Sequence, residues 1–346
     1  MPGKITIKDV AKEAGVSYQL VSAVLGGRES TIRFSAATKA KVLAAAARLG
    51  FRPSILARSF QANRSFLVGI LVCHEQNFLL SDLIRGIQET LQPEGITPLF
   101  LSHKTPAEEA TNLHLLQERR VDAVITNSYG GDPETYARLV KAGVPVVELF
   151  NYQFAKLGIP HVRQDMVAVG YEATRHLLEL GHRRIALLTH ERYKKHFDAD
   201  DQWRGYCQAL KEAGLKPQVF THSLACYMPG RVLYWYHGAK EIADQVLGPK
   251  RPTAIVCYDC AHVQALIEEA DPRGIRVPKD LSLVGYQDWD ICETTTPRIT
   301  TLLVDPFKMG QAAAATILAQ LRGETAGNTL VKPDFIHRAS TGPAAN

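Results

Sequence analysis

The chain has 346 residues, of which 46% are hydrophobic and 22% are charged. This balance is typical of a globular protein with two or three compact units, and it excludes a largely disordered chain. The N-terminus lacks the apolar core of a signal peptide, and the longest apolar run, residues 66–73, is too short to span a bilayer. We therefore expect a cytoplasmic protein with no membrane partner.

The positive charge is concentrated at the N-terminus. Residues 1–64 hold eleven Lys and Arg against three Asp and Glu, a net charge of +8, whereas the remaining residues carry −3. Clustered cations at one end are typical of a segment that neutralises phosphates. A basic tail without such a role is the alternative, but this segment is also patterned to fold.

The first 50 residues predict three short helices around one small core. The first helix follows a capping-box-like Thr6 with Asp9 in its first turn, and the second is capped by Ser17. The third begins after Ser35, and glycines end the first and third. Helical spacing places these residues in the core: Ile7, Val10, Ala11, Ala14, Val21, Val24, Leu25, Val42, Ala46 and Leu49. The first two helices form a helix-turn-helix pattern.

Two sequence segments narrow this helix-turn-helix pattern to a particular family. Residues 5–17, ITIKDVAKEAGVS, and residues 53–60, PSILARSF, resemble the head of the LacI/GalR family of transcription regulators. The resemblance implies a helix-turn-helix DNA-binding domain at 1–52, a hinge helix and linker at 53–64, and a ligand-sensing and dimerisation domain at 65–342. A helical bundle that binds no DNA is the alternative.

In this resemblance the helix that opens at Ser17 enters the major groove of operator DNA. Glutamine can contact adenine at two points, and arginine can read a base or hold a phosphate. The expected base-reading residues are Tyr18, Gln19, Ala23 and Arg33, the last being equally a phosphate ligand. The expected backbone contacts come from hydroxyl side chains, which position the head: Thr6, Ser17, Ser22, Ser35 and Thr38.

The segment 53–60 begins with Pro but is too short and polar to form a stable helix alone. The resemblance implies a hinge helix that includes Ala57 and Arg58 and forms when DNA supports it. Phe60 stands where relatives commonly have a Leu that wedges into the minor groove. Packing of Phe60 on the body is the alternative.

From residue 66 onward, short apolar runs alternate with helix-like stretches. The runs cover residues 67–72, 98–101, 123–126, 144–149, 185–189, 254–257 and 281–286. The helix-like stretches cover residues 82–92, 108–119, 133–142, 167–180 and 261–270. This alternation predicts parallel sheets with helices on both faces.

Phrases at residues 144–147, 176–188 and 277–286 resemble, in order, the sensing domain of the same family. The implied fold is an all-α helix-turn-helix head followed by an α/β, periplasmic-binding-protein-like body of two doubly wound parallel-sheet subdomains. The N-subdomain would cover about 65–162 and 293–324, and the C-subdomain about 163–292 and 325–342. Such bodies dimerise and hold a small-molecule effector at the carboxyl ends of their strands.

The expected effector cleft departs from that of sugar-binding relatives. Those relatives typically have an Asp, an Arg, an Asn-Asp pair and a second Asp at four positions. The corresponding residues here are Phe150, Gln202, Tyr258-Asp259 and Gln287-Asp288, and of the usual polar set only Asn127 is kept. We therefore expect an uncharged effector with a stackable face, first a sugar or sugar-like compound such as a neutral glycoside, and second a heterocycle. The candidate effector residues are Phe78, Asn127, Phe150, Gln202, Trp235, Tyr258, Asp259 and Gln287. Core packing is the alternative for the aromatic ones.

The sequence gives little support for metal, redox or catalytic chemistry. The six cysteines form no dense framework, and the C-x-x-C at 257–260 has no second cysteine pair to complete a metal site. We therefore expect no disulfide, no bound metal and no cofactor. Motifs of common hydrolases and nucleotide-binding proteins are absent, which argues against an enzyme. The predicted function is a repressor that binds a pseudo-palindromic operator as a homodimer under effector control. A solute-binding protein of transport is the alternative, but it leaves residues 1–64 unexplained.

Overall fold

The computed structural model describes residues 5–25, 32–51, 59, 62, 64–73, 80–128, 130–191, 201–223 and 233–344. The predictions for Ala57, Arg58, Phe60 and Phe78 lie outside these residues. The chain divides into one unit of Met1–Leu67 with Leu116–Asp122, and a second of Val68–Leu115 with Ala123–Asn346. Among the described helices, none is both long and apolar enough to cross a membrane.

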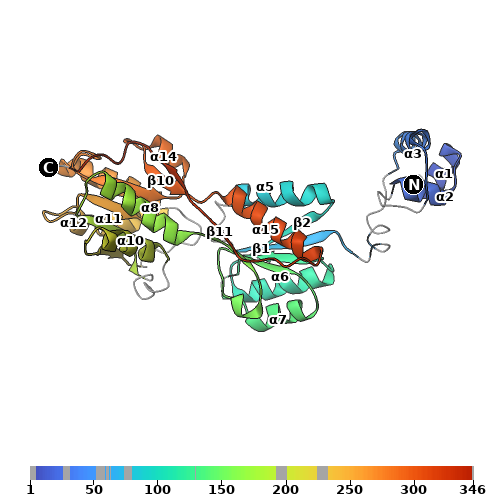
Figure 1. Ribbon diagram of the computed structural model, residues 1–346, viewed down its shortest axis with the longest axis horizontal. Helices are drawn as coiled ribbons and strands as arrows, with labels where there is room; N and C mark the ends of the chain where they lie inside the picture. The colour runs from blue at the N-terminus through green and yellow to red at the C-terminus, as the bar shows by residue number, and fades with distance from the viewer. Residues whose placement is uncertain are drawn as a thin grey trace. The chain divides into compact units, whose positions relative to one another are not determined.

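The first unit contains the three expected helices, α1 (Ile7–Ala14), α2 (Tyr18–Leu25) and α3 (Ala36–Leu49) (Figure 1). The carboxylate of Asp9 accepts the backbone N–H and the hydroxyl of Thr6 at 2.8 and 2.7 Å, and Ser35 accepts the N–H of Thr38 at 3.1 Å. These caps fix the helix starts as predicted. The buried core is small and apolar: Val10, Ala11, Ala14, Val21, Val24, Val42, Ala45 and Ala46.

Asp122 anchors the chain where it enters β1 (Leu67–Cys73). Its carboxylate accepts the Ser65 N–H and hydroxyl at 2.7 and 2.9 Å, the Phe66 N–H at 3.0 Å and Arg64 Nε at 3.2 Å. The Asp122 side chain is only 8% exposed, so these charge-assisted bonds are shielded from water. They hold residues 64–66 beside the residue that precedes β3 (Ala123–Thr126).

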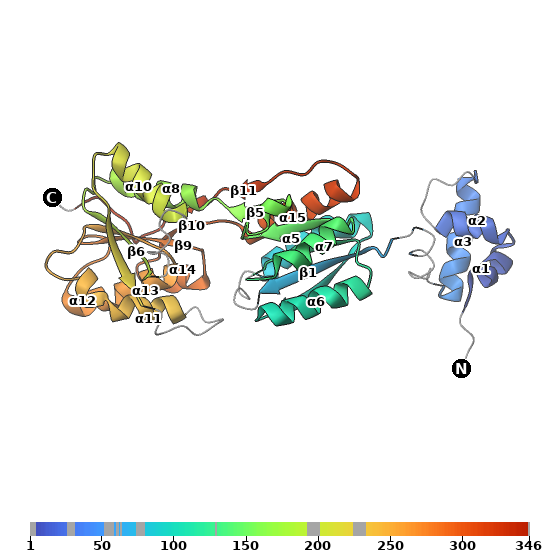
Figure 2. The same ribbon diagram turned by 90° about the horizontal axis from the view of Figure 1, so that it is seen from below.

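Sheet A of the second unit has the order β11-β5-β4-β3-β1-β2. β1 pairs in parallel with β3, β3 with β4, β4 with β5, and β5 with β11. Helices α5 and α15 lie side by side on one face, and α6 and α7 cover the other (Figures 1 and 2). The bounds are β2 (Thr97–His103), β3 (Ala123–Thr126), β4 (Val146–Leu149), β5 (His161–Gln164), β11 (Thr329–Val331), α5 (Leu80–Leu91), α6 (Pro106–Glu118), α7 (Pro133–Lys141) and α15 (Pro306–Leu321).

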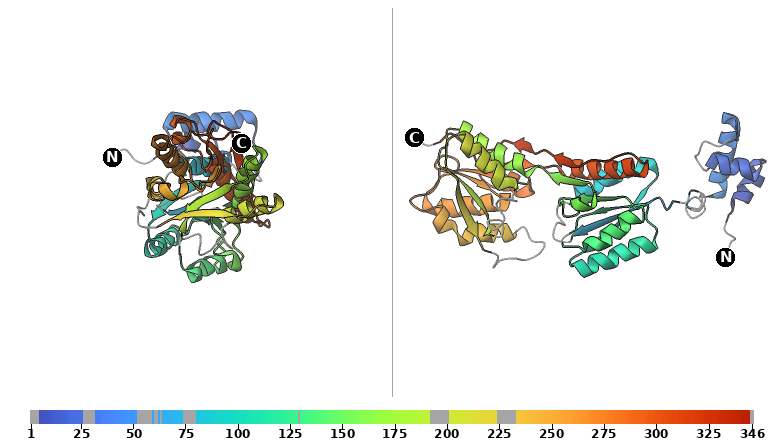
Figure 3. Two further views of the ribbon diagram at one scale, coloured as in Figure 1. Left: turned by 90° about the vertical axis from the view of Figure 1, so that its left-hand side faces the viewer. Right: turned by 60° about the horizontal axis from the view of Figure 1, so that its bottom comes forward.

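Sheet B has the order β12-β10-β9-β8-β6-β7, and β12 runs antiparallel to β10 at one edge. Helices α8 and α10 cover one face, and α11 and α13 the other (Figures 2 and 3). The strands are β6 (Ile185–His190), β7 (Gln218–His222), β8 (Ala254–Cys257), β9 (Ser282–Tyr286), β10 (Thr300–Leu303) and β12 (Asp334–Ile336). The helices are α8 (Met166–Glu179), α10 (Asp201–Glu212), α11 (Leu233–Glu241), α12 (Ala243–Val246), α13 (Cys260–Ala270) and α14 (Asp290–Thr294).

The sheet order corrects the predicted subdomain boundaries. β10 belongs to sheet B and β11 to sheet A, so residues 300–303 lie in the C-subdomain and residues 329–331 in the N-subdomain. The prediction had assigned these two segments the other way round. β5 also extends sheet A to Gln164. Short strands such as β10 and β11 pair by tertiary contact, which their own residues do not specify.

Two helix pairs pack at glycines. A Cβ at Gly170 on α8, or at Gly205 on α10, would lie 2.0 Å from a backbone carbonyl oxygen of the other helix. On α5 and α15, a Cβ at Gly86 or Gly310 would lie 2.2 or 2.3 Å from such an oxygen. Real Cβ atoms do not approach so closely, so both helix pairs depend on glycine at the crossing.

Candidate DNA-binding and effector sites

Helix α2 presents one exposed face that carries most of the predicted base-reading residues. Tyr18 is 52% exposed, and Gln19 is also exposed. Ser22 and Ala23 follow one helical turn later, so these residues share a face, while Val21 and Val24 point into the core. The arrangement leaves this face available for the edges of bases.

The predicted phosphate-contacting hydroxyls also cap helices. Ser17 Oγ accepts the N–H of Leu20 at 3.3 Å and thereby starts α2. Because Ser17 acts as an acceptor there, its own O–H remains able to donate to a phosphate. The hydroxyl of Thr6 instead donates to Asp9, so a phosphate would have to compete with that carboxylate for it. Arg33 is exposed just before α3.

In the body, four candidate effector residues directly follow strands. Asn127 and Phe150 follow β3 and β4 in sheet A, and Tyr258 and Gln287 follow β8 and β9 in sheet B. Their backbone N–H groups continue the ladders, as in the 2.9 Å bond from Phe150 N to the Val162 oxygen. The carboxyl edge of each parallel sheet, where α/β proteins place their ligands, therefore holds two of them.

Phe150 and Gln287 share a strained backbone. Their φ angles are 65° and 72°, in the left-handed region that glycine favours. Such a conformation costs a bulky residue roughly 1–2 kcal/mol, and it persists where surrounding contacts impose it. Each of these residues is the first after a central strand of its sheet, so the two sheets have a left-handed residue at equivalent positions.

Gln202 and Asp259 are more buried than their predicted role required. Gln202, the second residue of α10, is 1% exposed. Asp259 is 6% exposed, and its carboxylate accepts the N–H of Ala261 at 2.8 Å, which caps α13. Burial raises the pKa of Asp259 to about 7. Asp259 therefore has a structural role as a helix cap.

Trp235 of α11 and Tyr258 lie together, with ring centroids 5.3 Å apart and ring planes inclined by 38°. The structure thus joins two aromatic residues that the sequence placed far apart. Both are only partly buried. A tilted aromatic pair of this kind offers a face for a flat apolar surface, such as one side of a sugar ring or a heterocycle.

A cluster of buried histidines, which the sequence reasoning missed, packs around Trp235. His190 and His222 end the neighbouring strands β6 and β7 in register, and His262 lies in the first turn of α13. All three are at most 1% exposed. The centroid of the Trp235 ring lies 6.3, 5.9 and 5.2 Å from those of His190, His222 and His262. The sequence signal that could have indicated this cluster is the Thr-His pair that ends both strands.

Two contacts of His222 extend the cluster. Its Nδ1 lies 3.4 Å from the Ser223 carbonyl oxygen, and its Nε2 lies 3.0 Å from His262 Nε2, so one of these two ring nitrogens donates to the other. A Cβ at Gly238 would lie 2.2 Å from His222 Nδ1, so α11 packs its backbone directly on this ring. Burial lowers the pKa of His222, and lowers that of His262 further.

These lowered pKa values predict a loss of stability in acid. The unfolded chain takes up protons at these imidazoles below about pH 6.5, whereas the folded chain does not until lower pH. The free energy of unfolding should therefore fall as the pH drops from about 6.5 to 5 and be insensitive to these groups above about 7. Urea titrations at several pH values measure the slope. His262→Gln should flatten it, whereas His237→Gln, at an exposed neighbour, should not.

A second buried polar cluster lies in the N-subdomain. Tyr136 of α7 donates to Glu109 of α6, and its hydroxyl lies 2.7 Å from Thr126 Oγ1 at the end of β3. His103, which ends β2, lies 3.4 Å from the Glu109 carboxylate, and burial lowers the His103 pKa. All four residues are at most 2% exposed. These contacts join the ends of β2 and β3 to α6 and α7.

The C-x-x-C pair shows no sign of reactivity. Cys257 and Cys260 are buried and free, and burial raises the pKa of each thiol. A buried thiol with a raised pKa provides little thiolate for redox or metal chemistry. Within the described part of the chain, no group of three His, Cys, Asp or Glu side chains is arranged to hold a metal ion.

A three-helix head with an exposed second helix, followed by two α/β sheets with candidate binding residues at their carboxyl edges, defines a DNA-binding regulator with a ligand-sensing body. Comparison with known families agrees. Residues 6–54 match bacterial regulatory proteins of the lacI family, and residues 174–341 match a periplasmic binding protein-like domain.

Similar proteins extend this match over nearly the whole chain. The HTH-type transcriptional repressor PurR of Pectobacterium carotovorum subsp. carotovorum is 30% identical over 97% of this chain and 96% of its own. The crystal structure of the lac repressor dimer bound to operator and the anti-inducer ONPF has a TM-score of 0.77 at 24% identity, covering 98% of this chain and 100% of that one. A complex of the regulator CelR with cellobiose has a TM-score of 0.66 at 24% identity, covering 97% and 99%. The chain belongs to the lacI family of bacterial transcriptional regulators.

Proposed function

We propose that the protein is a repressor that binds a pseudo-palindromic operator as a homodimer and responds to a small uncharged effector. The observation that carries the DNA-binding part is the exposed face of α2, where Tyr18, Gln19 and Ala23 stand opposite the packed residues of the head. The net charge of +8 over residues 1–64 supports it, since a cationic head is attracted to phosphates. Membership of a family that includes PurR repressors favours repression.

Each side chain of this face has a distinct role in reading bases. Gln19 donates to and accepts from one adenine in the major groove, and Tyr18 offers a hydroxyl at the start of α2. The methyl group of Ala23, one turn further along, contacts a thymine methyl. Arg33 reaches a base or a phosphate from the segment before α3. The hydroxyls of Ser17 and Ser22 position the helix on the backbone.

The homodimer follows from the small size of the head. One recognition helix reads only a few base pairs, so two heads on a symmetric body are needed for an operator of useful length. Two-fold symmetry of the protein then requires two-fold pseudo-symmetry of the DNA. The lac repressor, whose fold this chain shares, is a dimer on its operator.

The effector part rests on the residues at the carboxyl edges of the two sheets. Trp235 and Tyr258 offer an aromatic surface, and Gln202, Gln287 and Asn127 offer amides. None of these side chains is charged, which favours a neutral ligand held by hydrogen bonds and stacking. A neutral glycoside or modified sugar is our first candidate, in keeping with the cellobiose bound by a regulator of the same fold. A heterocycle is the second.

Selection of binding sites from random duplexes tests the operator proposal. The selected sequences should contain two inverted half-sites, and the wild-type protein should bind them as a dimer. If each dimer neutralises 6–10 phosphates, affinity should fall by about 10³- to 10⁵-fold between 50 and 200 mM salt. A scrambled duplex of equal length is the control. Equal affinity for one isolated half-site and for the full site would contradict the dimer.

A further inference from the structure

The α6–β3 segment (Leu116–Asp122) lies against the residues through which the chain enters β1. This segment and Met1–Leu67 belong to one compact unit. Besides accepting donors from residues 64–66, Asp122 donates its own N–H to the Leu67 oxygen at 2.8 Å. A molecule bound at the end of the linker is therefore also close to the α6–β3 segment.

Two adjacent arginines, Arg119 and Arg120, follow α6 in this segment and are both exposed. The Val121 N–H donates to the Leu116 oxygen at 3.2 Å, a bond that closes the end of the helix. Arg120 has a φ of 51°, in the left-handed region where glycine is favoured at the end of a helix. Because Val121 is buried, the turn keeps both arginines at the surface.

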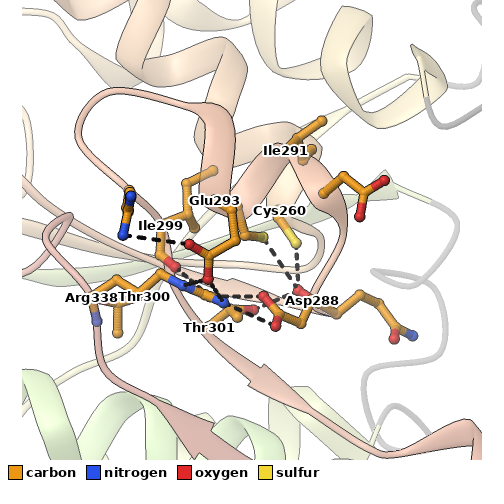
Figure 4. A network of polar contacts seen from close by, with 12 residues as sticks. Cys260, Asp288, Ile291, Glu293, Ile299, Thr300, Thr301 and Arg338 are labelled. Carbon is orange, nitrogen blue, oxygen red and sulfur yellow. Dashed lines mark hydrogen bonds and ion pairs between the residues drawn. The ribbon is translucent and has the colours of Figure 1, made fainter.

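The guanidinium groups of these two arginines are not used within the fold. In the part of the chain that the structure describes, neither Arg119 nor Arg120 forms an ion pair or a side-chain hydrogen bond. Arg338 is the contrasting case, since it donates to both Asp288 oxygens at 2.7 and 3.0 Å and to Glu293 at 2.8 Å (Figure 4). An arginine without such partners keeps its charge and its five donors for a bound anion.

The carboxylates of the α6–β3 segment do not cancel this charge. Asp122 is shielded from water and already accepts Arg64 and the N–H of Ser65. Glu118, the last residue of α6, is exposed, but it is one carboxylate against two guanidinium groups. The segment therefore presents a positive surface, and residues 1–64 of the same compact unit carry a net charge of +8. Such a concentration of cations is typical of a surface that binds a polyanion.

We propose that Arg119 and Arg120 bind phosphates of operator DNA, so that the DNA-binding surface includes the α6–β3 segment as well as the head. This inference rests on the operator binding proposed above. Arg64 ends the linker, and it donates to Asp122, two residues along the chain from Arg120. The planar fork of an arginine matches two oxygens of a phosphate. This role also explains an arginine at a left-handed position that glycine occupies at lower cost.

The salt dependence of operator binding tests this proposal, with a duplex selected from random sequences as the probe. Each phosphate contact contributes about 0.9 to the slope of log affinity against log salt. The double variant Arg119→Gln/Arg120→Gln removes two contacts from each protomer of a dimer, so it should lower the slope by about 3–4. Between about 50 and 200 mM salt, the variant should lose about 100-fold less affinity than the wild type. Preference among duplexes that differ at single positions should be unchanged, because phosphates carry no sequence information.

Arg183→Gln/Arg184→Gln is the matched control, because these two arginines are also adjacent, exposed and followed by a strand, β6, but belong to the second unit. The control makes the same change of charge and should leave the slope unchanged. A wild-type slope in the first double variant, or an equal reduction in the control, would overturn the proposal. Relaxed preference at one base pair would assign the arginines to a base and would overturn it as well. Failure of the wild type to bind any selected duplex would instead contradict the proposed function.

Arg120→Gly separates a phosphate contact from a role in folding. Glycine adopts the left-handed conformation at no steric cost, so the melting temperature should equal that of the wild type or exceed it by about 1–3 °C. The salt slope of the dimer should nevertheless fall by about 2. Arg120→Lys keeps the charge and should keep most of the slope. A lower melting temperature with an unchanged slope in Arg120→Gly would mean that this side chain supports the turn and not the DNA, which would contradict the proposal.

Discussion

Replacing Gly205 by alanine is expected to lower the free energy of unfolding by about 3 kcal/mol. Gly205 lies where α10 crosses α8, and a Cβ there would lie 2.0 Å from the Val167 carbonyl oxygen and 2.7 Å from the Tyr171 nitrogen. These are backbone atoms of a helix and cannot swing aside like a flexible side chain. The helices would have to separate, and the buried core beneath them, including Tyr206 and Ala173, would lose contacts.

Chemical denaturation of wild type and variant measures this effect. Gly327→Ala is the matched control, because no atom lies within 4 Å of a Cβ at that position and its backbone is not left-handed. The control should change the free energy of unfolding by less than about 0.5 kcal/mol. A loss below about 1 kcal/mol in Gly205→Ala would show that the helix pair can separate at little cost.

The close helix packing at these glycines could not be predicted from the sequence. The helical pattern around Gly170 is visible in the chain, but nothing local shows that another helix backbone will lie against that residue. Close approach is a tertiary property, and so is the pairing of short strands. The same reason explains the errors at β10 and β11, whose few residues do not specify a sheet. Long apolar strands such as β1, in contrast, were predicted almost to the residue.

The residues of the candidate sites also fall into two groups: those that local sequence patterns predict and those that meet only through tertiary packing. The face of α2 follows from helical period alone, because a helix with Val21 and Val24 in the core must turn Tyr18 and Gln19 outward. The residues after the strands were found because strand ends carry the family resemblance. The histidine cluster was missed, since His190, His222 and His262 are distant in sequence and meet only when β6, β7 and α13 pack.

The last prediction concerns the reading of bases. Gln19→Ala should reduce discrimination at one base pair of each half-site by about 1–3 kcal/mol, because alanine cannot replace a two-point contact with adenine. Gln19 is exposed at the start of α2 and lies outside the buried core of the head, so the variant should fold normally. Tyr18→Ala should relax preference at a neighbouring base pair. The measurement is the affinity of each variant for a set of duplexes that differ at single positions.

Arg33→Ala, measured on the same duplexes, separates the two roles left open for this residue. Loss of a base contact would relax preference at one position of each half-site. Loss of a phosphate contact in both protomers would weaken all duplexes equally and reduce the salt slope of the dimer by about 2. Gln208→Ala, an exposed glutamine of α10 in the body, is the control and should alter neither quantity. If Gln19→Ala and Tyr18→Ala both kept the full sequence preference of the wild type, the recognition surface would have to lie elsewhere on the head, and our assignment of α2 would be wrong.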